Sequence, residues 1–446
     1  MRRAAIRTLL MLAPVIALLP GAGATPPLGR PGTYAQELAA ARREGLPTRP
    51  QDLRVPMPPP ERNAATYYRR LMALRKAKPL SQTAQAAERL AGRMTLTPTE
   101  LALVRKALAE RRADQALVHR AVACERCVFA RDWSKGPYTP FPEFAYSRDA
   151  VRMLALEAAV RVAERKPLDA VRTMALGFRI GEHIASDRVL MAHLVAVAVD
   201  AIAHRGMMSI AYATGGAPPV LQAVRTAIGR KNAWPDAARA LDGEIVTGLQ
   251  SVELTRREGP KGWVELTSGT GATTPRPRDW RRFADENGTW VLWYYRHAAR
   301  AVRRPQPERR QYLKALSADL QGREKARDSR VLMAAIIVPV YLQTAASDAV
   351  RGARIDCLRA GCEVLLWRAK HGAWPRNLRE CMARVPADPF DGKPLRYRRE
   401  GDGFVIYSVG ETGRFDGGTP GVKPKPVESL FRWPKPAYWD APARRR

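Results

Sequence analysis

The feature that most constrains the fold is a pair of amphipathic helical stretches separated by only two residues. From Ser147 to Arg165, apolar residues recur three and four positions apart, as on one face of a helix. Lys166 and Pro167 end that stretch, and a second one follows at once, from Leu168 to Ile184. Helices with so short a connection run antiparallel and bury their apolar stripes against each other. The sequence therefore predicts helical hairpins as the building unit.

The same periodicity fills most of residues 60–350, where no strand alternation competes with it. Further helices are expected near residues 34–43, 63–71, 101–123, 189–204, 220–228, 237–254, 290–302, 308–320 and 349–371. Near the C-terminal end, Leu395–Arg398 and Phe404–Ser408 alternate around Gly401-Asp402-Gly403, which indicates a β-hairpin. The predicted fold class is mainly α: packed helical hairpins, reminiscent of a repeat array without a fixed period, followed by a small α+β hairpin module.

Shifts in composition divide the chain into five expected segments. They are a signal peptide at 1–24, a Pro-rich lead-in at 25–60, a helical domain at 61–350 with a basic loop at 256–285, a helix-plus-hairpin module at 351–418, and a disordered, basic, Pro-rich tail at 419–446.

The first residues have the pattern of a secretory signal. Three arginines precede an apolar run from Thr8 to Leu19, and Ala22-Gly23-Ala24 is a small-x-small cleavage signature. An uncleaved membrane helix is the alternative, but the run is about a dozen residues and a bilayer requires roughly 20. We therefore expect an exported protein, periplasmic or extracellular, with no transmembrane anchor after cleavage.

Charge narrows the choice of partners. The 446 residues include 75 Lys and Arg against 43 Asp and Glu, a formal net charge of +32. Such a surface attracts polyanions, which outside the cytoplasm are anionic lipids or acidic polysaccharides. No zinc-finger spacing or RNP-like strand is present, so no specific nucleic-acid partner is expected. The expected partner is an envelope polyanion or an unidentified protein.

Three strings near the C-terminus carry a resemblance to a known family: Gly372-Ala373-Trp374-Pro375, the turn from Asp388 to Tyr397, and Tyr407-Ser408-Val409-Gly410 with Asp416-Gly417-Gly418. Together they resemble the tail of the major pseudopilins of type II secretion, over Ile355 to Gly418. The resemblance implies a helix followed by a hairpin, and a last loop that binds calcium. The chain lacks the long N-terminal hydrophobic helix of pseudopilins, so polymerisation into a pilus is not expected.

A second resemblance covers most of residues 60–418. The opening Asn63-Ala64-Ala65-Thr66-Tyr67-Tyr68 and the segment Cys127-Val128-Phe129, followed by a helical middle and the same tail, resemble exported bacterial proteins of uncharacterised function. This resemblance implies the architecture and no activity.

Four hard oxygen donors in the tail form a candidate calcium site, namely Asp388, Asp391, Glu411 and Asp416. Calcium takes six to eight oxygen ligands, which include backbone carbonyls from turn-rich segments. The alternative is that the aspartates cap turns. No other cofactor is expected, because Gly269-Thr270-Gly271 lacks the rest of a phosphate-binding motif.

The chain contains five cysteines, and an exported protein favours disulfides. The disulfide candidates are Cys124, Cys127, Cys362 and Cys381, and the odd number leaves at least one thiol free. Structural disulfides or buried thiols are the first interpretation of Cys124-Glu125-Arg126-Cys127. A redox site and a metal site are the alternatives, although neither a strand nor a second CxxC accompanies the motif.

No set of nucleophile, base and orienting residue is visible, so no catalytic residue is predicted. His193 and His204 share a helix face but lie about 16 Å apart along it, too far for one metal. Three hypotheses for function remain. The first is a non-catalytic helical scaffold or binding protein of the cell envelope. The second is a binder of envelope polyanions, and the third is a hydrolase or redox enzyme whose site assembles only in the fold.

Overall fold

A computed structural model describes residues 28–229, 237–267, 274–415, 430–436 and 439, apart from the side chains of 340–346. The predicted signal peptide lies outside this part of the chain. The described chain is mainly helical with a small antiparallel sheet near the C-terminus, which confirms the predicted fold class.

The first half of the chain contains most of the shorter helices. They are α2 (Tyr34–Arg43), α3 (Ala64–Ala77), α4 (Gln82–Glu88), α5 (Pro98–Glu110), α6 (Arg112–Ala123), α7 (Phe144–Ala163), α8 (Pro167–Ala185), α9 (Leu190–Ala213) and α10 (Pro218–Gly229), with short 3-10 turns η1 (Pro50–Leu53), η2 (Pro60–Arg62) and η3 (Trp133–Tyr138).

The second half continues with longer helices and ends in the sheet. Its elements are α11 (Ala237–Glu258), α12 (Pro260–Thr267), α13 (Trp280–Val302), α14 (Glu308–Lys325), η4 (Ser329–Val331), α15 (Leu332–Ile337), α16 (Pro339–His371), α17 (Leu378–Cys381), β1 (Arg396–Glu400), β2 (Gly403–Tyr407) and β3 (Leu430–Trp433).

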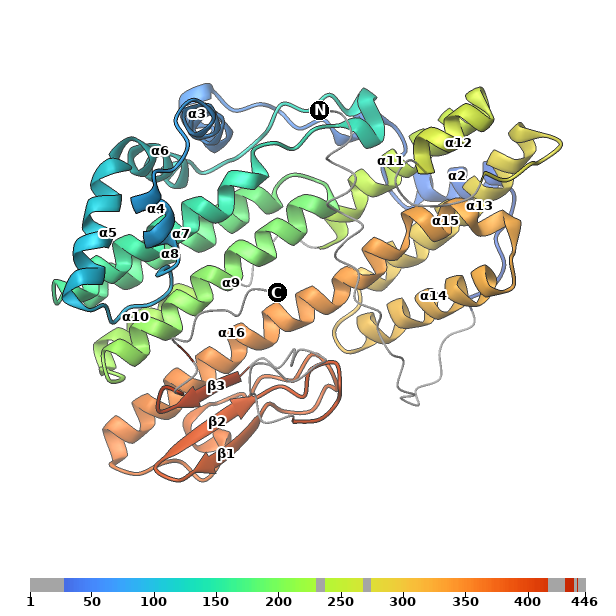
Figure 1. The fold of residues 1–446 in the computed structure, drawn as a ribbon. Coiled ribbons are helices and arrows are strands. Elements are labelled where there is room, and N and C mark those ends of the chain that lie inside the picture. Colours follow the sequence, from blue (N-terminus) through green and yellow to red (C-terminus); the bar gives the residue numbers. More distant parts are fainter. Residues whose placement is uncertain (1–27, 230–236, 268–273, 416–429, 437–438, 440–446) are drawn as a thin grey trace.

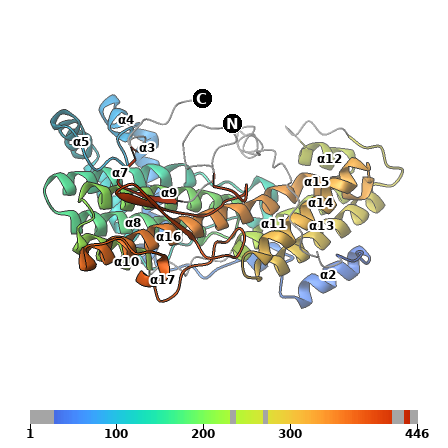
Figure 2. The ribbon, with the colours of Figure 1, turned by 90° about the horizontal axis from the view of Figure 1, so that it is seen from below.

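Two apolar cores organise these helices. The first joins α7, α8, α9 and α10 to the C-terminal half of α16, and the second joins α11, α13, α14 and α15. Figures 1 and 2 show the two groups towards opposite ends of the molecule, with α16 passing from one to the other. As predicted, α7 and α8 pack as a hairpin, and Arg165 adopts a left-handed backbone (φ 60°) at the turn between them.

Helix α9 is long and apolar enough to cross a membrane by composition, and within the described residues it is the one such helix. However, 61% of its apolar window is buried inside the protein, in the first core. Its hydrophobicity is therefore explained by packing against its neighbours.

Two predicted boundaries are wrong. The segment 256–285, predicted as a basic loop, contains the whole of α12 and the start of α13. Buried Trp263 of α12 packs edge-on against Phe283 of α13, with ring centroids 5.6 Å apart. The many charged residues of this segment gave no indication of that apolar contact. The predicted division at residue 350 falls inside α16, which is continuous from Pro339 and packs against α14 and α15, so the helix of the C-terminal module begins beside the second group of helices.

The predicted hairpin is confirmed, with β1 and β2 antiparallel and Glu400 opposite Gly403. The expectation of disorder for 419–446 is wrong for β3, which pairs with β2 and places Phe431 opposite Ile406. Phe431 is fully buried against α16 and stacks on Tyr212 of α9 (5.8 Å between centroids). Burial of one large aromatic side chain orders a segment whose composition is otherwise typical of a mobile tail.

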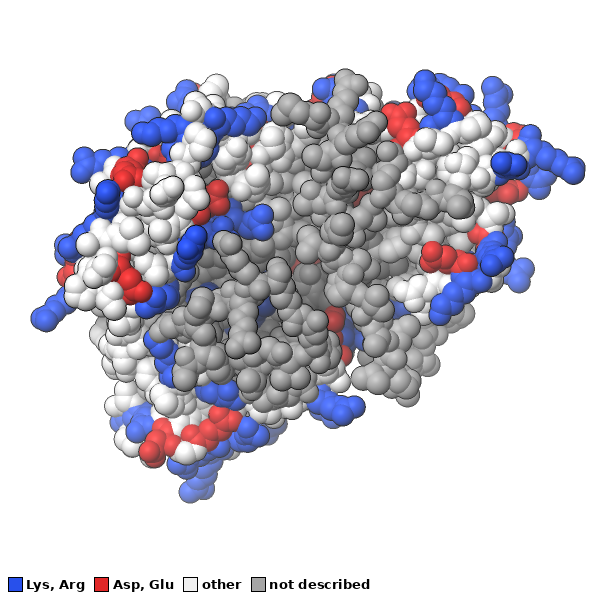
Figure 3. Space-filling view, viewed as in Figure 1, with Lys and Arg blue, Asp and Glu red and all other residues white. Residues whose placement is uncertain are grey.

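Lys and Arg side chains stand out around the margin of the face shown in Figure 3, with Asp and Glu between them. Most acidic side chains near the surface lie within an ion pair with arginine, for example Asp169 with Arg172 and Glu286 with Arg282. The excess of positive charge therefore comes from basic side chains that outnumber the carboxylates, and it is spread over the surface.

Because β3 packs on α16, alanine substitutions at two glycines of this helix should have different effects on stability. A Cβ at Gly361 would lie 2.3 Å from the ring of Phe431, whereas nothing lies within 4 Å of a Cβ at Gly352. We expect Gly361→Ala to lower the free energy of unfolding by about 1–3 kcal/mol through overpacking. Gly352→Ala should be neutral or stabilising by up to about 1 kcal/mol, because alanine favours helix. Urea unfolding of both variants provides the measurement. Equal changes in the free energy of unfolding would contradict the close packing of Phe431 on Gly361.

Candidate functional site

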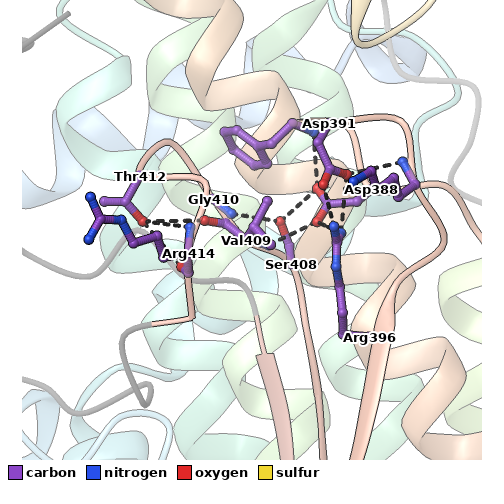
Figure 4. A network of polar contacts seen from close by, with 10 residues as sticks. Asp388, Asp391, Arg396, Ser408, Val409, Gly410, Thr412 and Arg414 are labelled. Atoms are coloured by element: carbon purple, nitrogen blue, oxygen red, sulfur yellow. Dashed lines mark hydrogen bonds and ion pairs between the residues drawn. The ribbon is translucent and has the colours of Figure 1, made fainter. Parts of the chain in front are cut away.

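The predicted calcium loop is built around a carboxylate that is already saturated with hydrogen bonds (Figure 4). Asp388 is fully buried, and its Oδ1 accepts from the backbone N–H of Phe390 (3.0 Å) and from Ser408 Oγ (2.9 Å). Its Oδ2 accepts from the N–H of Val409 (2.8 Å) and from Arg396 Nη1 (2.7 Å). The four bonds fill the acceptor capacity of a carboxylate.

The guanidinium of Arg396 lies between Asp388 and Asp391 and neutralises their negative charge, as a bound cation would. It also binds Asp391 through both terminal nitrogens. Partial burial acts to raise the pKa of Asp391, but hydrogen bonds from Arg396 and from the Lys393 N–H outweigh it and lower that pKa. The two aspartates thus stabilise the turn and the strand end as turn-capping groups.

The other two predicted calcium ligands do not complete a cluster in the described residues. Glu411 lies in the turn that follows β2, and Asp416 lies outside the described residues. In the part of the chain that is described, no group of three or more His, Cys, Asp or Glu side chains is close enough to hold a metal. Calcium stays a prediction, and its binding would have to displace Arg396.

None of the five cysteines is joined in a disulfide in the structure, so the pairing among the four candidates stays a prediction. Burial raises the pKa of Cys124 and of Cys127, and raises that of Cys362 to about 12 and of Cys381 to about 11. Thiols with raised pKa values are weak nucleophiles. Burial therefore favours the first interpretation, in its form of buried thiols, over a redox site at Cys124 and Cys127.

A cavity of about 690 Å³ lies next to the CxxC segment, and we call it the arginine pocket. Four parts of the chain enclose it: the lead-in at 53–57, the irregular segment 125–133, the end of α8 with the loop to α9 (179–188), and the start of α11 (239–242). Its lining includes six arginines and four carboxylates, a formal surplus of two positive charges. They are Arg54, Arg126, Arg131, Arg179, Arg188 and Arg239, with Glu125, Glu182, Asp187 and Asp242.

Arg131 fixes the floor of the arginine pocket. Its side chain is only 4% exposed and bonds Asp187 Oδ2 (2.9 Å) and Glu143 Oε2 (3.0 Å), which are themselves buried. The guanidinium also lies 4.7 Å from the ring centroids of both Phe129 and Phe141. A buried arginine needs such partners, because desolvation of its charge costs several kcal/mol.

Two further arginines attach the walls to each other. Arg188 bonds Asp242 of α11 (2.7 Å) and donates to the carbonyl of Asp52 in the lead-in (2.9 Å). Arg179 donates to the carbonyls of Cys124 (3.1 Å) and Glu125 (2.9 Å) from α8. Burial raises the pKa of Asp187 and of Asp242, although the adjacent arginines act to lower both.

His183 lines the pocket with both of its ring nitrogens engaged. Nε2 faces the carbonyl oxygen of Cys124 (3.1 Å), which can only accept, so this nitrogen carries the proton. Nδ1 therefore accepts from the hydroxyl of Tyr68 (3.0 Å), whose pKa is raised by burial well above its ordinary value. The imidazole is fixed as one neutral tautomer and joins α3, α8 and the CxxC segment.

A further carboxyl group, that of Glu244, lies on α11 two residues beyond the last lining residue, Asp242. Glu244 Oε1 accepts from the N–H of Leu190 (3.1 Å) in the first turn of α9. Burial raises the pKa of Glu244 to about 7, although that hydrogen bond acts to lower it. Gly243 allows the close approach, because its N–H bonds the carbonyl of Arg188 (2.9 Å) and a Cβ would lie 2.1 Å from that oxygen.

Sequence reasoning missed this pocket. In the sequence the lead-in is visible only as a Pro-rich segment, and the CxxC segment only as a pair of thiols. The lining residues come from four segments spread over nearly 190 positions, and no spacing rule connects them. The available signal was Val55-Pro56-Met57-Pro58, where large apolar residues occur in a stretch without helical periodicity.

Comparison with known proteins gave no relatives. No family model matches the chain, and neither the curated proteins nor the solved structures contain a match. Inferences about function therefore depend on the geometry and charge of the described residues.

Removal of Arg131 should be far more destabilising than removal of an exposed arginine. Arg131→Met leaves two buried carboxylates without their cation and should lower the free energy of unfolding by about 3–5 kcal/mol. Arg172→Met is the control, because Arg172 is 76% exposed in its pair with Asp169 and should change stability by less than about 0.5 kcal/mol. Urea unfolding compares them, and a small loss for Arg131→Met would show that the buried network is dispensable.

The raised pKa of Glu244 predicts a pH dependence of stability. The folded state holds the proton up to about pH 7, whereas a free glutamate releases it near 4.5. Its contribution is complete below pH 4.5 and is lost as the pH rises through 7. As the pH rises from 5 to 8, the free energy of unfolding of Glu244→Gln should therefore increase by about 1–3 kcal/mol relative to that of the wild type. Chemical unfolding across this range measures it, with Glu253→Gln on the exposed side of α11 as control for net charge. Parallel curves for wild type and Glu244→Gln would refute the assignment.

Proposed function

We propose that the protein is an exported, non-catalytic helical binding protein of the cell envelope, and that it holds an anionic group in the arginine pocket. The observation that carries this proposal is the convergence of six arginines and four carboxylates on one cavity of about 690 Å³. That volume is typical of pockets for small molecules or for one unit of a polymer. Arginine suits carboxylate, sulfate and phosphate groups, since its planar fork of donors binds them in pairs.

The lining separates into arginines that build the pocket and arginines that face solvent. Arg131, Arg179 and Arg188 hold carboxylates or backbone carbonyls of the surrounding segments. Arg54 and Arg239 are exposed, one on the lead-in and the other on α11. Arg126 is exposed as well, but it donates to the carbonyl of Pro56. Arg54 and Arg239 are therefore the exposed guanidiniums that we expect to meet an anion entering from solvent.

Binding is favoured over catalysis by the state of the pocket's acids and its imidazole. Asp187 holds the buried Arg131, Asp242 holds the partly exposed Arg188, and His183 uses both ring nitrogens in structural hydrogen bonds. A general base needs a free lone pair directed at its substrate. The chemistry that this lining offers to a ligand is mainly hydrogen-bond donation from guanidinium groups.

A smaller cavity of about 400 Å³ extends the basic region. It shares Arg188 with the arginine pocket and is also lined by Arg42, Arg49 and Asp52. Two neighbouring cavities with surplus arginine favour an extended anionic partner over a single ion. Together with the signal-like N-terminus and the net charge of +32, this supports the hypothesis of a binder of envelope polyanions.

Binding of a defined polyanion tests the proposal. Fluorescein-labelled dextran sulfate should bind the purified protein with an affinity that falls as salt rises, and labelled neutral dextran should not bind. Arg54→Gln/Arg239→Gln should weaken binding by about 10- to 100-fold, because two charge-assisted hydrogen bonds are lost.

The matched control is Arg172→Gln/Arg282→Gln, which removes the same charge from side chains 76% and 79% exposed elsewhere. It should alter binding less than about threefold, as expected for distant surface charges. Equal losses for the two double variants would show a nonspecific basic surface. No binding of any anion would overturn the proposal in favour of a scaffold that docks another protein.

A further inference from the structure

We propose that the arginine pocket binds an amphipathic anion, in which the charged group is joined to an apolar chain. The inference rests on the proposed function and adds the second half of the ligand. Its basis is the juxtaposition of an exposed apolar edge, formed by Val55 and Met57, with the arginines of α8 and α11 in one cavity.

The apolar edge is unusual within this protein. Five large hydrophobic side chains are conspicuously exposed in the described residues, and two of them, Val55 (40%) and Met57 (51%), line this one pocket. A single exposed apolar side chain needs no explanation, but a pair within a cavity marks a binding surface. A purely hydrophilic anion would leave this edge in contact with water.

The lead-in presents these two side chains in a fixed arrangement. Pro56 and Pro58 restrict the backbone on either side of Met57, and Val55 and Met57 both line the pocket. The carbonyl of Pro56 accepts from Arg126 Nη2 (3.2 Å), and Asn63 Nδ2 contacts Met57 Sδ (3.3 Å). A wall held in this way loses little entropy when a ligand binds.

The floor continues the apolar surface. Val128, Phe129 and Trp133 also line the pocket, so its apolar lining is not confined to the lead-in. Methionine at position 57 adds an unbranched, polarisable side chain that adapts to an apolar chain. The lining of this one cavity thus combines apolar side chains with several guanidinium groups.

This division of the walls selects a ligand class. An anionic amphiphile, such as an acyl chain bearing a phosphate or carboxylate, satisfies both walls at once. A neutral amphiphile leaves the surplus positive charge without a partner, and inorganic phosphate leaves the apolar edge wet. The two halves should therefore contribute together to affinity.

Isothermal titration calorimetry with three probes tests the inference: dodecyl phosphate, inorganic phosphate and dodecyl maltoside, the detergents below their micelle concentrations. Dodecyl phosphate should bind at least about tenfold more tightly than either of the others. Val55→Ser/Met57→Gln should weaken dodecyl phosphate binding about tenfold and leave phosphate binding within about twofold.

Val264→Ser is the matched control, because Val264 of α12 is 54% exposed and lies outside the pocket lining. It should not change dodecyl phosphate binding. Equal affinities for dodecyl phosphate and inorganic phosphate would overturn the inference. So would equal losses of dodecyl phosphate affinity in Val55→Ser/Met57→Gln and in Val264→Ser. If dextran sulfate still binds through Arg54 and Arg239, the proposed function stands without it, and if no anion binds, both fail.

Discussion

The arrangement of the pocket depends on the burial of one positive charge. Arg131 brings together the irregular segment after the CxxC motif, the start of α7 through Glu143, and the α8–α9 loop through Asp187. Because a buried guanidinium is unfavourable without these partners, the three segments have one favourable arrangement. The aromatic rings of Phe129 and Phe141 exclude water from the group and strengthen its electrostatic interactions. The floor of the pocket follows from this constraint.

The same use of arginine recurs away from the pocket and explains the distribution of charge. Arg396 lies between Asp388 and Asp391, and Arg351 of α16 bonds buried Asp200 of α9 (3.1 Å). With 43 acidic residues against 75 basic ones, carboxylates consumed in such pairs leave arginine in excess on the surface and in the pocket. Each such pair is neutral, so the net charge of +32 comes from the basic side chains that outnumber the carboxylates.

Local signals account for what could be predicted from the sequence. Periodicity located the hairpin of α7 and α8, and the capping box of Thr97 and Glu100 is present at the start of α5. Contacts between distant segments account for what could not: β3 is only four residues long, and the partners of Arg131 lie 12 and 56 positions away. Neither a short apolar run nor an isolated arginine indicates its partner, so the third strand and the ion pairs of Arg131 had no signature.

Shape and charge are not independent in this pocket. Arg188 supplies positive charge, but it also holds the lead-in through the carbonyl of Asp52 and holds α11 through Asp242. Arg126 likewise supplies charge and fixes the apolar edge through the carbonyl of Pro56. Substitution of either would move a wall as well as remove a charge, so loss of binding in such a variant would not identify the ligand. Arg54 and Arg239 are exposed at the rim, and there the electrostatic contribution can be separated from the architecture.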